Sequence, residues 1–129
     1  MASVQRLTLL PQSFAIVPLA AGSGLPWWSA ASRGLLAWTR TDSEDSLVCE
    51  QRLVPDGVRA ERGYRALQVA GSLPMHATGI LAGLAAPLAA AGVPIFVLST
   101  FETDYVLVPA GRLEAAVRAL RTAGHAIEP

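Results

Sequence analysis

The chain has 129 residues, of which ten are basic and ten acidic, so its formal net charge is zero. A neutral chain offers no electrostatic footprint for nucleic acid or for an anionic membrane surface, and we expect neither as a partner. Its single cysteine, Cys49, excludes an internal disulfide and fits the reducing cytoplasm.

The first half of the chain predicts short strands separated by turns. The N-terminal residues form no basic-then-apolar leader, which also favours a cytoplasmic protein. Pro11 and Pro18 interrupt the first apolar segment, so it forms one long strand or two broken ones. The polar stretch 53–63 is the candidate boundary, because it contains a Pro-Asp-Gly turn signal. The expected elements are a strand or strands within 7–19, a helix of about two turns at 27–33, and strands at 35–39 and 46–50.

The second half contains a stronger helix signal. Ile80, Leu81, Leu84 and Leu88 recur at helical spacing and make one apolar stripe. Gly92 is expected to end this helix in a left-handed conformation. The other expected elements are strands at 64–70, 93–98 and 104–108, a helix at 112–123 and a closing strand at 125–128.

A charge-free run from residue 66 to residue 101 raises the question of a membrane span. Three prolines divide the run, much of it is Ala and Gly, and its period changes from helix to strand at Gly92. We therefore interpret it as a buried helix followed by a buried strand. Pro87 is expected to kink the helix, because it removes a donor and crowds the carbonyl of Gly83.

Few residues in the sequence could carry chemistry. His76 and His125 have no partner at metal-ligand spacing, so we interpret both as surface or turn histidines and expect no metal site. Ser99 and Thr100 lack an assignable base, so we expect no nucleophilic catalysis. Cys49 lies in a strand pattern typical of a small buried hydrophobe. One of the adjacent tryptophans 27 and 28 is expected to pack in the core and the other to cover the helix start, with a pocket or an interface as the alternative.

The segment AGVPIFVLSTFETDYVLV, residues 91–108, carries a family resemblance together with the helices that flank it. It resembles an ACT domain, the small ligand-sensing βαββαβ module of amino-acid metabolism. It is most similar to a subgroup of short bacterial proteins whose ACT units are like those of the CASTOR-type arginine sensors. The resemblance is strong in the C-terminal half of the chain and weak in the rest.

The resemblance implies an α+β, ferredoxin-like fold, and we interpret the chain as two ACT units in tandem. A weak internal repeat supports the tandem, because Leu25-Pro26 and Leu73-Pro74 both precede a helix. Coincidence explains this repeat about equally well. The predicted domains are a degenerate, shortened ACT-like unit at 1–62 and an ACT domain at 63–129.

The resemblance also implies where a ligand would bind. ACT domains bind amino acids near the start of the first helix, and the related subgroup uses a Ser/Thr-rich strand end followed by an Asp. Bare N–H groups at a helix start suit a carboxylate, and an Asp suits an ammonium. The predicted ligand-binding residues are Thr78, Gly79, Ile80, Leu81, Ser99, Thr100, Phe101 and Asp104. The alternative is that Thr78 only caps the helix and Asp104 only opens a strand.

We expect a small-molecule-binding regulatory or sensor protein without catalytic activity or cofactor, and its ligand to be an amino acid. The alternative is a structural protein-interaction module with a vestigial pocket. Because the charge-free run is more apolar than one small module can bury, a homodimer is expected. Regulation without an attached catalytic domain would act through this assembly or through an unidentified protein partner.

Overall fold

The computed structural model describes residues 4–74 and 76–129, which form two compact units. Unit 1 comprises the described residues of Met1–Pro11 and Arg65–Pro129, and unit 2 comprises Gln12–Tyr64. Strands β1 (Arg6–Leu19) and β4 (Glu61–Val69) each contribute residues to both units. The assignment of two domains at 1–62 and 63–129 stays a prediction.

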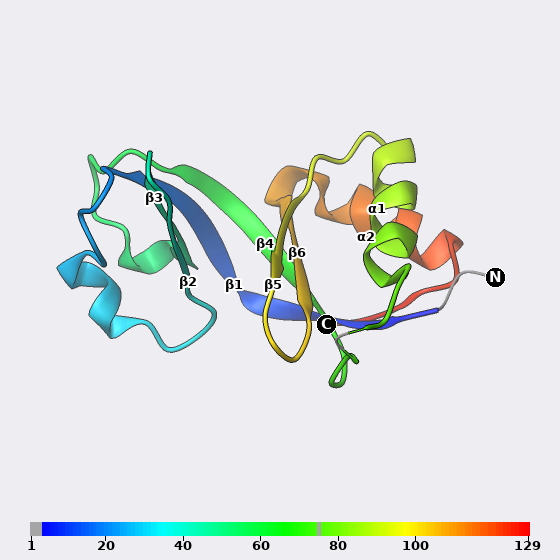
Figure 1. The fold of residues 1–129 in the computed structure, drawn as a ribbon. Helices are drawn as coiled ribbons and strands as arrows, with labels where there is room; N and C mark the ends of the chain where they lie inside the picture. Colours follow the sequence, from blue (N-terminus) through cyan, green and yellow to red (C-terminus); the bar gives the residue numbers. More distant parts are fainter. Residues whose placement is uncertain (1–3, 75) are drawn as a thin grey trace. The chain divides into compact units, whose positions relative to one another are not determined.

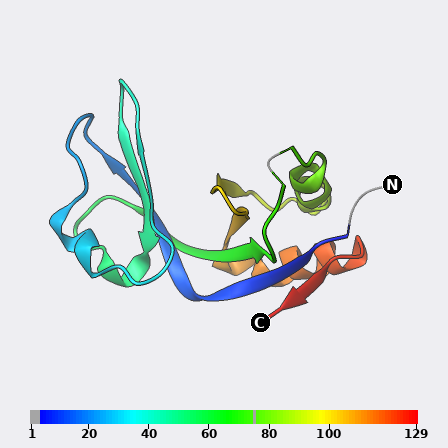
Figure 2. The ribbon, with the colours of Figure 1, turned by 60° about the horizontal axis from the view of Figure 1, so that its bottom comes forward.

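Unit 1 is a sheet with two helices, so the protein is of mixed α/β class (Figure 1). Its sheet has the strand order β7-β1-β4-β6-β5. The start of β1 runs parallel to β7, so two segments from opposite ends of the chain lie side by side (Figure 2). The elements that follow β4 are α1 (Ile80–Ala90), β5 (Phe96–Ser99), β6 (Asp104–Pro109), a 3-10 turn (Ala110–Arg112), α2 (Leu113–Thr122) and β7 (Ala126–Glu128).

The order β4, α1, β5, β6, α2, β7 agrees with the expected βαββαβ pattern. The sequence did not predict that β1 would lie between β7 and β4 in this sheet. Its continuity through Pro11 and Pro18 resolves the open choice in favour of one long strand. The strand expected at 93–98 begins only at Phe96, because the backbone of Val93 still takes part in the end of the preceding helix.

Both helices pack on one face of the unit 1 sheet. Alternate residues of a strand point to the same face of the sheet. Leu67 and Val69 are two positions apart, and so are Val106 and Val108. These four side chains share one core with the buried leucines of both helices. The helix residues in this core are Leu84 and Leu88 of α1, with Ala116 and Leu120 of α2.

Each helix ends in the same glycine motif. Gly92 has φ +72°, its N–H bonds to the carbonyl of Ala89, and the N–H of Val93 bonds to the carbonyl of Leu88. This is the Schellman arrangement, which satisfies carbonyls that the helix leaves without partners. Gly124, with φ +99°, ends α2 in the same way. The expectation for Gly92 is therefore confirmed.

His125 follows the turn that ends α2, as one of the two predicted alternatives has it, but with 5% of its surface exposed it is not a surface histidine. Its Nδ1 accepts a hydrogen bond from the Gln5 N–H at 3.0 Å, and its Nε2 lies 2.9 Å from the carbonyl oxygen of Gly83. Because Nδ1 is the acceptor, Nε2 carries the proton and donates to Gly83. That carbonyl lacks its usual helical donor because residue 87, four positions later, is proline. The imidazole thus replaces the N–H that Pro87 removes, and α1 continues past it.

Unit 2 has its own strands and core. Strand β2 (Ala37–Arg40) pairs antiparallel with β3 (Asp45–Glu50), which pairs antiparallel with the second part of β1. The helix expected at 27–33 is a short 3-10 helix, Trp27–Ala31, and a second one spans Gln51–Leu53. The buried core residues are Ala15, Val17, Leu47, Cys49, Leu53 and Val54.

Three side chains of unit 2 test the interpretation of its aromatic and thiol groups. Cys49 is fully buried, as predicted, and burial together with the neighbouring Glu50 charge raises its pKa to about 11. Trp28 packs against the core, which confirms one half of the tryptophan prediction. Trp27, by contrast, is 85% exposed and covers little of the chain.

Two buried carboxylates mark the two ends of β3, and each holds a loop. Asp45 accepts hydrogen bonds from the N–H groups of Gly22 and Gly24, both at 3.1 Å. Glu50 accepts from the N–H groups of Arg33 and Gly34 at 2.9 and 2.7 Å, through one oxygen. Its other oxygen pairs with the Arg52 guanidinium at 2.9 Å, and Trp38 and Arg40 also approach Asp45.

These contacts lower the pKa of both carboxyl groups. Burial raises the pKa of Asp45, but hydrogen bonds from Gly22, Gly24 and Trp38 and the charge of Arg40 outweigh it. The pKa of Glu50 is lowered by the Arg33 and Gly34 N–H groups against the effect of burial, with Arg52 assisting. Both groups therefore bind protons less readily in the folded protein than in the unfolded chain.

We expect stability to fall when acid protonates these two carboxylates. A carboxyl group whose pKa is lower in the folded protein than in the unfolded chain contributes its full stabilisation at pH values above its unfolded pKa, about 4. This stabilisation is lost as the pH falls from there through the folded pKa. The free energy of unfolding, measured by urea denaturation between neutral and acidic pH, should decrease in this window. Asp45→Asn and Glu50→Gln should each flatten the decrease, whereas Glu61→Gln on the exposed start of β4 should leave it unchanged. Equal slopes in all four proteins would contradict the assignment.

Candidate functional site

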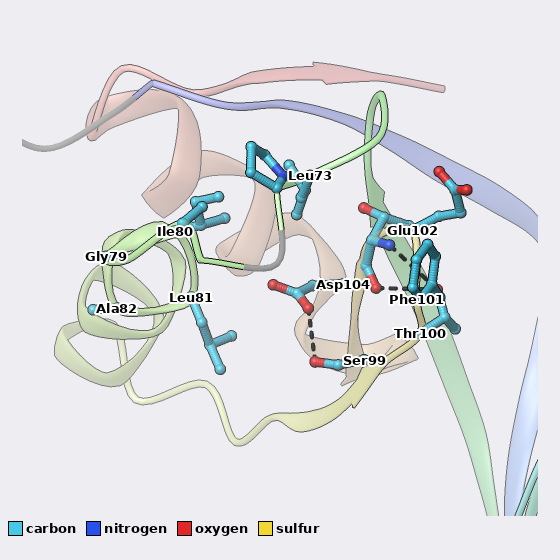
Figure 3. Close-up of a pocket in the computed structure, with 13 residues that line it drawn as sticks. Leu73, Gly79, Ile80, Leu81, Ala82, Ser99, Thr100, Phe101, Glu102 and Asp104 are labelled. Atoms are coloured by element: carbon cyan, nitrogen blue, oxygen red, sulfur yellow. Dashed lines mark hydrogen bonds between the residues drawn. The ribbon is translucent and has the colours of Figure 1, made fainter.

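A cavity of about 290 Å³ lies in unit 1 between the start of α1 and the turn that joins β5 to β6. Its size is near the lower limit of small-molecule sites, roughly 300–1,000 Å³. It is lined by Leu73, Pro74, Ala77, Gly79, Ile80, Leu81, Ala82, Ser99, Thr100, Phe101, Glu102, Thr103 and Asp104. Figure 3 shows these side chains around the hollow.

The residues at the start of α1 line this cavity. Gly79 is the N-cap residue, with φ +80°, and no side chain caps the helix there. The first intrahelical bond of this turn runs from the Gly83 N–H to the Gly79 carbonyl. The preceding N–H groups, those of residues 80–82, have no helical acceptor. They carry the partial positive charge of the helix start, which suits an anionic group.

Asp104 supplies the negative charge opposite the helix. It is the first residue of β6 and is partly buried. Its Oδ1 accepts a hydrogen bond from the Ser99 hydroxyl at 2.7 Å, which orients the carboxylate. In Figure 3 the carboxylate points from the strand toward Leu81 and the start of α1. The cavity therefore has a positive wall of N–H groups and a negative wall at Asp104.

The β5–β6 turn is fixed by two threonines. The Thr100 N–H donates to the Thr103 carbonyl at 2.8 Å, and the Thr103 N–H donates to the Thr100 hydroxyl at 3.2 Å. The buried hydroxyl of Thr103 donates to the Val69 carbonyl of β4 at 2.7 Å. The Leu73 N–H bonds to the Glu102 carbonyl at 2.7 Å. The turn that carries the cavity wall is thus held against the end of β4.

Seven of the eight predicted ligand-binding residues line this cavity: Gly79, Ile80, Leu81, Ser99, Thr100, Phe101 and Asp104. Thr78 is exposed and is not among the lining residues. The sequence did not predict Thr103 as a lining residue, because the only indication was a second threonine in the same polar turn. It also missed the apolar residues before the helix, such as Leu73 and Ala77, because no periodic pattern covers them.

A second hollow, of about 670 Å³, lies in unit 2. Three of its four charged lining residues have partners, since Glu50 bonds to Arg52 and to loop N–H groups, and the Arg62 guanidinium donates to the carbonyls of Pro55 and Val58; the fourth is Asp56. We therefore favour the unit 1 cavity, where Asp104 accepts from the Ser99 hydroxyl and the start of α1 lines the same hollow.

Two findings limit the chemistry of the described residues. Across residues 4–74 and 76–129, no three His, Cys, Asp or Glu side chains gather closely enough to hold a metal ion. Within the same part of the chain, no helix combines the length and the apolar character that crossing a bilayer requires.

Comparison with known sequences places a family model on the second half of the chain. The model described as ACT domain matches residues 59–122. No functionally curated protein matches the chain.

Solved structures extend the likeness to the whole chain. Protein Atu0741 from Agobacterium tumefaciens is 35% identical, with 98% of this chain and 93% of that protein covered and a TM-score of 0.91. VC0802 from Vibrio cholerae, of unknown function, is 17% identical, with 92% and 89% covered and a TM-score of 0.73. The regulatory subunit of aspartate kinase from Thermus flavus is 14% identical, with 95% and 99% covered and a TM-score of 0.64. At the last two identities the likeness shows the fold alone.

Proposed function

We propose that this chain, which contains an ACT domain over residues 59–122, is a regulatory protein that binds a free amino acid in the unit 1 cavity. The observation that carries the proposal is that the start of α1, whose first N–H groups have no helical acceptor, and the Asp104 carboxylate line one hollow of about 290 Å³.

The two walls suit the two charges of an amino acid. The carboxylate of the ligand would accept from the N–H groups of residues 80–82, where the helix dipole favours an anion. The ammonium would donate to Asp104, and a hydrogen bond between two charged groups is stronger than a neutral one. Ser99 holds Oδ1 of Asp104 and leaves the second oxygen for the ligand.

We also propose that the chain consists of two ACT units in tandem, that its fold is ferredoxin-like, and that it is related to the CASTOR-type arginine sensors. The fold likeness to a regulatory subunit of aspartate kinase supports a protein without catalytic activity, and we propose a cytoplasmic location from the sequence alone. Regulation would then act through a homodimer or a protein partner. Light scattering that gives a monomer at tens of micromolar, on the order of the range where weak interfaces form, would contradict the homodimer.

A thermal-shift screen against the common amino acids tests the proposed function. A ligand that binds only the folded protein raises its stability, by about 2.7 kcal/mol at a concentration 100 times the dissociation constant. At least one amino acid should therefore raise the melting temperature, and titration calorimetry should give one site per chain. If none does at millimolar concentration, the alternative of an interaction module with a vestigial pocket is favoured.

A further inference from the structure

The lining of the unit 1 cavity has an uneven charge composition. Two of the lining residues, Glu102 and Asp104, carry carboxylates. Among the lining residues that the structure describes, none is Lys, Arg or His. The remaining side chains are hydroxyls, at Ser99, Thr100 and Thr103, or apolar groups.

The main-chain carboxylate of a bound amino acid would use all the positive charge that the lining offers. Its carboxylate would occupy the N–H groups at the start of α1, which are the cavity's positive end. Its ammonium would pair with Asp104, leaving no cation for a second carboxylate on the ligand side chain. A second carboxylate would also lose hydration in a partly enclosed hollow, and that loss is costly when no partner replaces the water.

The walls beside the charged groups indicate what the ligand side chain contacts. Leu73, Ile80 and Leu81 line the cavity and are partly exposed to it. Phe101, 78% exposed, lies at the turn beyond Asp104 (Figure 3). The Glu102 side chain points away from the helix start in the same view, so it acts at the rim. Such walls suit an aliphatic chain, and a negative rim tolerates a cationic end but repels an anionic one.

We infer that the cavity selects amino acids whose side chain carries no negative charge, either neutral or basic, and rejects aspartate and glutamate. This inference rests on the proposed function. It concerns which class of amino acid binds, whereas the proposed function states only that one does.

Isosteric ligand pairs test the inference. Glutamine and glutamate have nearly the same shape and differ by one charge, as do asparagine and aspartate. By titration calorimetry the amide of each pair should bind about tenfold more tightly than the acid, or better. In the thermal-shift screen the two acidic amino acids should give the smallest shifts. An acid that binds as well as its amide, or that is the strongest binder in the screen, overturns the inference and leaves the proposed function standing. A chain that binds no amino acid overturns both.

A variant pair separates charge from shape. Ala77 lines the cavity and is exposed, so Ala77→Arg adds a cation to its wall. The difference in affinity between glutamine and glutamate should shrink at least severalfold in this variant. Ala90→Arg, on the exposed last turn of α1, adds the same charge away from the cavity and should preserve the difference. If the two variants change the difference equally, net charge rather than the lining causes it, and the inference fails.

Discussion

Replacing His125 by alanine should lower the free energy of unfolding by about 2–5 kcal/mol, since it leaves two backbone groups without partners. The Gln5 N–H loses its acceptor and the Gly83 carbonyl its donor, and the imidazole itself is 5% exposed. Urea denaturation measures the change. His76→Ala, at an exposed histidine, should change stability by no more than about 0.5 kcal/mol.

Pro87→Ala provides the decisive control. An alanine at position 87 has an N–H that can bond to the Gly83 carbonyl, so this carbonyl no longer depends on the imidazole. In that background His125→Ala should cost about 1–3 kcal/mol less than in the parent protein. Equal costs in both backgrounds would show that His125 stabilises the chain by packing and by its hydrogen bond from Gln5, and not by replacing the missing helical donor.

Asp104→Asn should weaken binding of the amino acid identified by the screen by roughly 10- to 150-fold. The amide keeps the shape of the side chain and can still accept from Ser99, but it has no charge to face the ligand ammonium. A hydrogen bond to a charged group contributes about 1.5–3 kcal/mol, which corresponds to that range of affinity. Titration calorimetry on the variant measures the loss.

Glu102→Gln is the matched control for this variant. It removes one negative charge from the same lining, but its side chain points away from the helix start. We expect it to change affinity less than Asp104→Asn by at least about fivefold, since an exposed charge at the rim is screened. If Asp104→Asn binds as tightly as the parent, Asp104 only opens β6 and the ligand site lies elsewhere.

Local patterns were enough to predict most of unit 1. The spacing of Leu84 and Leu88 located α1, and Gly92 marked its end, because both signals lie within a few residues of one another. The polar turn between two apolar strands likewise located the hairpin that carries Ser99 and Asp104. These are the parts of the site for which sequence neighbours are also structural neighbours.

The features that were missed depend on residues far apart in the chain. His125 contacts Gly83, 42 positions earlier, and Gln5, 120 positions earlier, so no local pattern could distinguish it from a surface histidine. The roles of Asp45 and Glu50 depend in the same way on loops 16 to 23 positions earlier. The insertion of β1 between β7 and β4 is a property of the sheet as a whole, and it leaves no trace in hydrophobic periodicity.

The burial of Cys49 gives unit 2 its own reporter. A thiol with no exposed surface and a pKa raised to about 11 is shielded from alkylating reagents and oxidants while unit 2 is folded. Labelling at neutral pH must therefore wait for the core around Cys49 to open, so its rate reports the opening of the unit 2 core. Because the chain has one cysteine, the signal needs no engineered mutation, and comparing it with and without an amino acid would reveal whether occupancy of unit 1 is sensed in unit 2.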